Sequence, residues 1–331
     1  LKNPDKKRDI IPDAQQEIVI NKAFKEANIL LTKRLEIELV FWENVVSSND
    51  RDMYQAYINK FPDGEFESIA NIKFLQLNSR NKIVKVELTK PEIDFGNYYA
   101  LVIGNNNYIH LPKLNTAVND AKFMANVLKE NYGFIVKTLE NATESDIMGA
   151  IYKLRKKLTI NDNLVIFYAG HGSLDKEIGV GYWHPIDSEQ NNPSKWISVS
   201  DITSQLMAFK AKHIMVIADS CYSGTLVRGL TPIQEPSLDE AWIKGLLKTK
   251  VRTAMSSGNY EVVSDAGGMN GHTWFTGSII KVLKENEGIL LGDQLFDKIK
   301  KVVQLNADQS PLYANMFAAG SEGGDFIFVK K

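Results

Sequence analysis

The sequence predicts an α/β protein in which helices cover both faces of a mostly parallel sheet, preceded by a small helical region. From residue 98 onward, short apolar runs alternate with segments of helical spacing, as in repeated strand–helix–strand units. Two of these runs, 163–169 and 213–218, have the length and composition of strands buried on both faces. The residues before about 92 show mainly helical spacing. We therefore expect two parts, a helical region at 1–92 and an α/β domain at 93–331.

The composition is that of an ordinary soluble globular protein. Of 331 residues, 44% are hydrophobic and 24% are charged, and the net charge is −1. This balance gives no support for nucleic acid as a partner, and no apolar run has the length of a membrane span. Cys221 is the only cysteine, so no disulfide can form within the chain. Because the charged start also lacks an apolar signal core, we expect a cytoplasmic protein.

The region 1–92 reads as a series of helices. Apolar residues recur at three- and four-residue steps over 14–47, and the same spacing continues over 51–60 and 65–78. Pro62-Asp63-Gly64 predicts a turn between the last two segments. Together they resemble one helix–turn–helix unit of the tetratricopeptide type. Since one unit does not make a stable solenoid, we expect a structural cap or a surface for a regulatory protein partner.

The elements of the α/β domain follow from its alternating pattern. Thr143 and Asp146 predict a capping box at one helix start. Strands are expected at 98–103, 134–139, 163–169, 213–218, 252–255 and 326–330, with a short ribbon near 179–183. Helices are expected at 117–128, 147–158, 199–209, 238–247, 273–285 and 293–305.

Two buried strands each end in a chemically reactive side chain. The strand at 163–169 leads into Gly170-His171-Gly172, and the strand at 213–218 leads into Asp219-Ser220-Cys221. Open α/β sheets place their ligands at the carboxyl ends of strands, and neighbouring strands lie only about 4.8 Å apart. We therefore expect His171 and Cys221 to meet in one crevice, which predicts a cysteine hydrolase.

A Cys–His pair supplies the chemistry of acyl transfer. A thiol with a pKa of about 8.5 needs activation, and a nearby imidazole can hold its proton and later deliver it to the leaving amine. The backbone N–H groups of Cys221 and Gly172 could bind the oxyanion. Taken singly, a free cysteine is more often a small buried apolar residue, and a lone histidine is more often structural. Their joint placement at two strand ends favours catalysis.

The sequence resembles the caspase-like cysteine peptidases, specifically the bacterial branch close to metacaspases. The motifs are YAGHG at 168–172 and DSCYSG at 219–224, with His171 lying 50 residues before Cys221. YYALVIGNNNY, LNTAVNDAKFM and AGSEGGDFIFV extend the resemblance over about 98–331. It implies a caspase-like α/β/α sandwich with a six-stranded sheet, and peptide hydrolysis by His171 and Cys221.

The same resemblance implies an acidic P1 pocket. Asp219 and Asp120 match the two pocket acids of metacaspases, although Ala117 stands where some members have cysteine. Two carboxylates in one slot favour a substrate with Arg or Lys at P1. The alternatives are a strand-end cap for Asp219 and an ordinary acid near a helix start for Asp120. Ser256 could pair with the substrate backbone, but turn serines have the same appearance.

Asp187 and Asp201 loosely match acids of the metacaspase calcium site. Calcium prefers six to eight oxygen ligands, so two carboxylates do not make a site, and solvated loop acids are the alternative. Peptide hydrolysis by a Cys–His pair requires no cofactor. The remaining histidines lack metal-ligand spacing with Cys221 and are expected to be structural: His110, His184, His213 and His272.

Two functions from different classes are consistent with these features. One is an endopeptidase that cleaves after Arg or Lys and is regulated by a partner, a ligand or autoprocessing. The long segment at 228–250, which leaves the nucleophile turn and contains basic residues, is the expected regulatory element. The other is a signalling or scaffold module that uses the same fold for protein contacts through its helical N-terminus.

Overall fold

The computed structural model describes residues 37–74, with gaps at 47, 49, 63, 68 and 72, and residues 93–220, 240–258 and 268–331. The chain divides into two compact units, Leu1–Glu92 and Ile93–Lys331. The helical residues expected before 37 and over 75–78 lie outside the described residues, as do Cys221 and most of the expected regulatory segment.

The first unit is a small helical cluster around an aromatic core. Its helix α2 spans Arg51–Lys60, as predicted, and Asp50 caps it by accepting from the backbone N–H groups of Asp52 and Met53. Residues 37–46 before it are helical, and helical residues recur from 67 to 74 after the turn. The core holds the rings of Trp42 and Phe66, which stack at 4.9 Å. Burial of these rings supplies the apolar area that such short helices need.

The second unit is built on a six-stranded sheet. Five neighbouring strands are parallel, and a sixth runs antiparallel at one edge, so the mostly parallel sheet predicted from the sequence is confirmed. In spatial order the strands are β10 (Leu312–Asn315), β8 (Val251–Ser256), β7 (His213–Asp219), β3 (Asp162–Ala169), β1 (Asn97–Gly104) and β2 (Ile135–Glu140).

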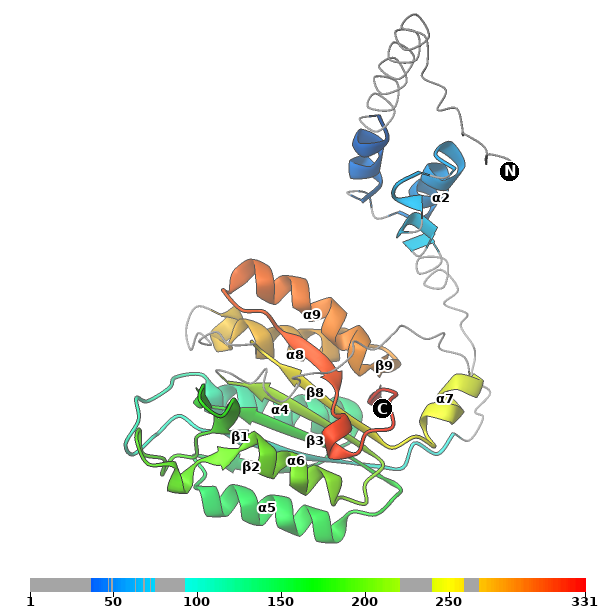
Figure 1. The fold of residues 1–331 in the computed structure, drawn as a ribbon. Helices are drawn as coiled ribbons and strands as arrows, with labels where there is room; N and C mark the ends of the chain where they lie inside the picture. Colours follow the sequence, from blue (N-terminus) through cyan, green and yellow to red (C-terminus); the bar gives the residue numbers. More distant parts are fainter. Residues whose placement is uncertain are drawn as a thin grey trace, which may run out of the picture. The chain divides into compact units, whose positions relative to one another are not determined.

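Helices cover both faces of this sheet (Figure 1). Alternate residues of β3 point to opposite faces, so Val165 and Phe167 pack with one helix layer while Leu164 and Ile166 pack with the other. The first layer contains α4 (Ala117–Tyr132), α8 (Trp274–Glu285) and α9 (Gly292–Asn306). The second contains α5 (Glu144–Lys157) and α6 (Val199–Met207), while α7 (Glu240–Leu246) contributes to a smaller cluster.

The structure adds elements that the sequence pattern did not reveal. The antiparallel sixth strand is β10, a four-residue segment too short to stand out. The last predicted strand exists as β11 (Ile327–Val329), but it pairs with β9 (Ile289–Leu291) in a separate small sheet. The predicted ribbon is β5 (Val180–Trp183), which lies between β4 (Gly172–Asp175) and β6 (Ile197–Ser198). The capping box of Thr143 and Asp146 at α5 is present, as predicted.

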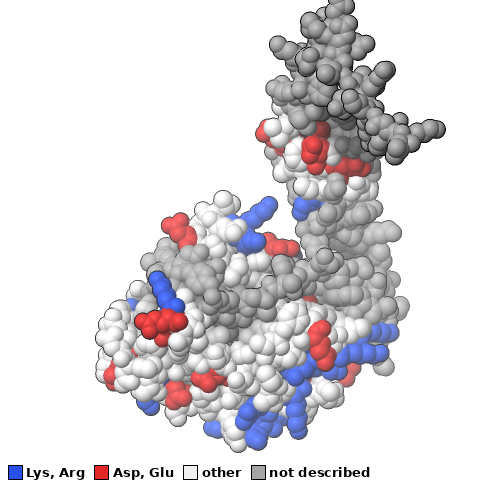
Figure 2. All heavy atoms as spheres, in the orientation of Figure 1, with Lys and Arg blue, Asp and Glu red and all other residues white. Residues whose placement is uncertain are grey.

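The charges of the described surface are mixed. On the face shown in Figure 2, Lys and Arg side chains gather toward one corner, and Asp and Glu are scattered over the rest. Among the described helices, none is long and apolar enough to span a bilayer.

Candidate active site

The carboxyl ends of β3, β7 and β8 lie at one edge of the sheet, where Asp219 and Ser256 end their strands and His171 follows β3. Ala169 at the end of β3 pairs with Asp219 at the end of β7, and Ala218 pairs with Ser256 at the end of β8. His171 follows its paired position by two residues, and Cys221 follows Asp219 by the same two residues. Cys221 itself lies outside the described residues. The register therefore brings the two strand exits to the same level of neighbouring strands.

His171 is held by a loop that follows β1. Its backbone N–H donates to the hydroxyl of Tyr108 at 2.7 Å, and the two rings lie 4.6 Å apart. Its ring Nε2 lies 2.8 Å from the carbonyl oxygen of Pro112. Because a carbonyl oxygen can only accept, Nε2 carries the hydrogen, and a neutral ring then leaves Nδ1 free to accept a proton. The Pro112 contact therefore selects the tautomer that a general base needs.

The β4–β5 ribbon fixes the backbone of His171. The backbone N–H of His184 donates to the carbonyl oxygen of His171 at 3.0 Å, and the hydroxyl of Tyr168 lies 2.8 Å from the same oxygen. The Tyr168 ring stacks on Trp183 at 4.4 Å. Burial, together with the nearby charge of His171, lowers the pKa of His184 to about 4. The ring of His184 is therefore neutral near pH 7.

The N–H of Gly172 is oriented away from the ribbon. Gly172 pairs with Trp183, and the hydrogen bond from His184 to His171 flanks this pair. That pattern makes Gly172 and Trp183 a pair without hydrogen bonds between them, whose N–H groups point away from the partner strand. The Gly172 N–H is thus not used in pairing with β5, as an oxyanion donor requires.

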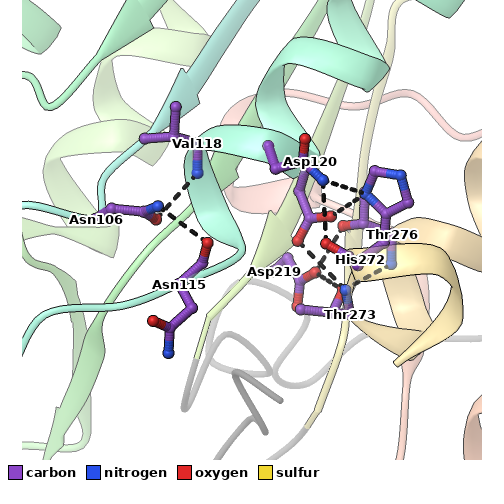
Figure 3. A network of polar contacts seen from close by, with 10 residues as sticks. Asn106, Asn115, Val118, Asp120, Asp219, His272, Thr273 and Thr276 are labelled. Atoms are coloured by element: carbon purple, nitrogen blue, oxygen red, sulfur yellow. Dashed lines mark hydrogen bonds and ion pairs between the residues drawn. The ribbon is translucent and has the colours of Figure 1, made fainter. Parts of the chain in front are cut away.

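The two predicted pocket acids lie in one polar network with the start of α8 (Figure 3). Asp219 is buried, and its Oδ2 accepts from the hydroxyls of Thr273 at 2.5 Å and Thr276 at 2.6 Å. Asp120, in the first turn of α4, is fully buried. Its Oδ1 lies 2.6 Å from Nδ1 of His272, and its Oδ2 accepts from the backbone N–H of Thr273 at 3.4 Å. Thr273 therefore contacts both acids.

The turn after β1, which leads to Tyr108, is also hydrogen-bonded to the start of α4. The Oδ1 of Asn106 accepts from the N–H of Val118, and its Nδ2 donates to the carbonyl of Asn115 (Figure 3). The side chain of Asn141, whose own φ is +50°, accepts from the N–H groups of Asn106 and Asn107. This turn therefore fixes the start of α4, where Asp120 lies. The same loop holds His171 through Tyr108.

Three serine hydroxyls at this edge are buried without a hydrogen-bond partner among the described residues. They belong to Ser220, Ser256 and Ser257. A buried hydroxyl without a partner is unfavourable by about 1–3 kcal/mol, and Thr253 and Ser278 carry further examples away from this edge. Ser256 thus lies where a substrate contact was predicted, and its role stays a prediction.

The predicted calcium ligands have local structural contacts. Asp187 accepts from the backbone N–H of Glu144 at the start of α5. Asp201 accepts from the hydroxyl of Ser198, the N-cap of α6. Among the described residues, no group of three His, Cys, Asp or Glu side chains could hold a metal ion. The two acids therefore do not form a site by themselves, and calcium dependence stays a prediction.

The fold described above is that of a caspase domain. The family model described as "Caspase domain" matches residues 97–319, and the chain belongs to this family. Its six-stranded sheet between two helix layers is the caspase-like α/β/α sandwich expected from the resemblance.

The chain is also similar to individual metacaspases and caspase-like structures. It is 28% identical to Metacaspase-1 of Sclerotinia sclerotiorum over 46% of this chain and 40% of the relative. It is 26% identical to Metacaspase-1 of Ajellomyces capsulatus over 53% of this chain and 55% of the relative. The chain thus spans about half the length of these fungal relatives or less. The expected membership of the bacterial branch stays a prediction. Caspase-1 of Spodoptera frugiperda superposes with a TM-score of 0.49 and 13% identity, covering 67% of this chain and 88% of that chain.

Proposed function

We propose that the protein is a cysteine endopeptidase that cleaves peptide bonds after Arg or Lys, with His171 and Cys221 as its catalytic pair. The observation that carries the proposal is the pairing of Ala169 with Asp219, from which His171 and Cys221 are each two residues removed. The hydrogen bond from His171 to Pro112 supports the role of the imidazole, because it leaves Nδ1 as the accepting nitrogen.

In this mechanism His171 first accepts the thiol proton of Cys221 at Nδ1. The thiolate attacks the carbonyl carbon of the scissile bond, and the N–H groups of Gly172 and Cys221 bind the oxyanion that develops. His171 then donates the proton to the leaving amine as the C–N bond breaks. Water, deprotonated by the same imidazole, hydrolyses the thioester and regenerates the thiol.

The two buried acids, Asp219 and Asp120, support a basic P1 residue. Asp219 and Asp120 come from different elements yet contact the same residue, Thr273. Two carboxylates at one locus attract a guanidinium or ammonium group and repel an acidic side chain. The substrate class proposed is therefore a peptide or protein with Arg or Lys at P1.

Regulation belongs to the same proposal. We expect the segment at 228–250 to control access to the site through rearrangement or autocleavage, and the helical unit at 1–92 to receive a regulatory protein. Intact mass after incubation of the wild-type protein beside Cys221→Ala tests autocleavage. A cut after a basic residue in the wild-type sample alone supports it, and an uncut, fully active wild-type chain contradicts it.

A fluorogenic peptide panel tests the proposed specificity. Arg, citrulline, Lys and Asp are compared at P1 in otherwise identical peptides, with calcium added or removed by EDTA. We expect kcat/KM to be highest for Arg or Lys and about ten- to a hundredfold lower for citrulline, which resembles Arg without its charge. A preference for Asp contradicts the proposal, and unchanged rates in EDTA contradict a calcium requirement.

A further inference from the structure

The residues that hold both pocket acids come from one short segment at the start of α8. They are His272, Thr273 and Thr276, called here the α8 entry residues. The chain separates Thr273 from Asp120 by 153 residues and from Asp219 by 54, so the contacts form only in the folded domain. All three lie in the interior, with Thr276 fully buried.

The hydrogen bonds to Asp219 have a defined direction. The hydroxyl of Thr273 accepts from the N–H of Thr276 at 3.0 Å, so its own proton is available for Asp219. The hydroxyl of Thr276 donates to the same carboxylate oxygen. Two hydroxyl donors on one oxygen, together with the positive end of the 12-residue helix α8, stabilise the ionised carboxylate. They also restrict it to one orientation.

The contact between His272 and Asp120 leaves the negative charge of the Asp120 carboxylate in place. The His272 ring is buried against Phe123, with the ring centres 4.7 Å apart. Burial, followed by the positive charge of Lys284, lowers the pKa of His272. A neutral ring donates its Nδ1 hydrogen to Asp120 without cancelling the carboxylate charge. The charge thus stays available for a cation.

We propose that His272, Thr273 and Thr276 are positioning residues that set the preference for a basic P1 side chain by holding Asp219 and Asp120 as ionised, oriented acceptors. This inference rests on the proposed function, since it assumes that the two acids receive the P1 side chain. A purely structural network would instead join β7, α4 and α8 and affect all substrates alike. The two roles therefore predict different substrate dependences.

The test compares Thr276→Val with the matched control Thr276→Ser. Valine keeps the shape and removes the hydroxyl, whereas serine retains it. We expect Thr276→Val to lower kcat/KM for the Arg peptide about tenfold, mainly through KM, with little change for the citrulline peptide. Thr276→Ser should restore the Arg preference to within about threefold of wild type. Alkylation of Cys221 by iodoacetamide and the Tm report whether catalytic thiol and fold are intact.

A second pair of variants keeps the proposal testable if Thr276→Val fails to fold. His272→Leu removes the donor to Asp120, and His272→Asn retains one; only the leucine variant should lose Arg selectivity. An unchanged ratio of Arg to citrulline rates in folded Thr276→Val or His272→Leu overturns the inference. Equal losses on both peptides indicate a structural role and overturn it as well. A wild-type protein that cleaves both peptides equally well instead refutes the proposed basic specificity itself.

Discussion

The two edges of the central sheet differ in how fully their buried polar groups are hydrogen-bonded. At the amino edge, the carboxylate of Asp162 accepts from Thr159 and Asn97, and His213 bonds the carbonyl oxygen of Leu246. At the carboxyl edge, three serine hydroxyls are buried without a partner among the described residues. The amino edge is thus satisfied by the fold alone, whereas the carboxyl edge retains hydrogen-bonding capacity beyond what the described fold uses.

Arg252 is the extreme case at the amino edge. Its guanidinium is fully buried, and it donates to the five backbone carbonyls of Leu206, Phe209, Ala211, Lys212 and Val251. His171, by contrast, has one ring nitrogen bound to a carbonyl and the other left to accept a proton. A cation saturated by backbone acceptors stabilises structure, and a base with one free nitrogen can perform chemistry. The comparison predicts where mutations affect rate and where they affect stability.

The largest effect is expected for His171→Ala. Loss of the general acid and base should lower kcat for an Arg peptide by about a hundred- to ten-thousandfold, with Tm nearly unchanged. His213→Gln, at the opposite edge, is the matched control and should retain nearly full activity per folded molecule. A kcat of His171→Ala within tenfold of the wild-type kcat would contradict the role of His171 as general acid and base.

The next effect is on stability. Arg252→Met removes five donors from buried carbonyls, and we expect the free energy of unfolding to fall by about 3 kcal/mol or more. Urea denaturation followed by circular dichroism measures it, and kcat per folded molecule should stay within twofold of wild type. A selective loss of kcat at unchanged stability would place Arg252 in the catalytic machinery instead.

Acid should destabilise the amino edge through His213. Burial lowers the pKa of His213 to about 4, although the hydrogen bond to Leu246 opposes this shift. Between about pH 6.5 and pH 4 the unfolded state therefore binds a proton that the folded state excludes, and stability falls as pH falls. The loss between pH 7 and pH 5 should be about 2 kcal/mol from this residue. His213→Gln should reduce the pH dependence by that amount; an equally steep dependence in the variant would contradict the assignment.

The sequence was sufficient for the parts that depend on local pattern. Apolar runs located the five parallel strands, and the polar residues after two of them located His171 and Asp219 at one edge, whereas Asp120 was identified only through the family resemblance. The antiparallel strand β10 was not predicted, because four residues carry too weak a periodic signal. The family match supports the caspase fold and leaves the roles of individual residues to experiment.

The supporting residues could not be predicted because they act over long sequence separations. Tyr108 contacts His171 across 63 residues, and Thr276 contacts Asp219 across 57. A tyrosine in a loop and a threonine in a helix carry no local sign of such contacts. His272, expected to be an ordinary structural histidine, proves to contact Asp120 directly. The run of asparagines after β1 was the one visible signal, and it marks the turn that positions both Tyr108 and α4.

Hydrolysis of an Arg-P1 peptide by Cys221→Ala, measured beside the wild-type protein, tests whether the thiol of Cys221 is the nucleophile. Both proteins should show the same Tm, because alanine replaces a single thiol. We expect the wild-type protein to cleave after Arg and the variant to show no cleavage above the uncatalysed background, since the thiolate is the attacking group. Hydrolysis by folded Cys221→Ala at the wild-type rate would contradict it.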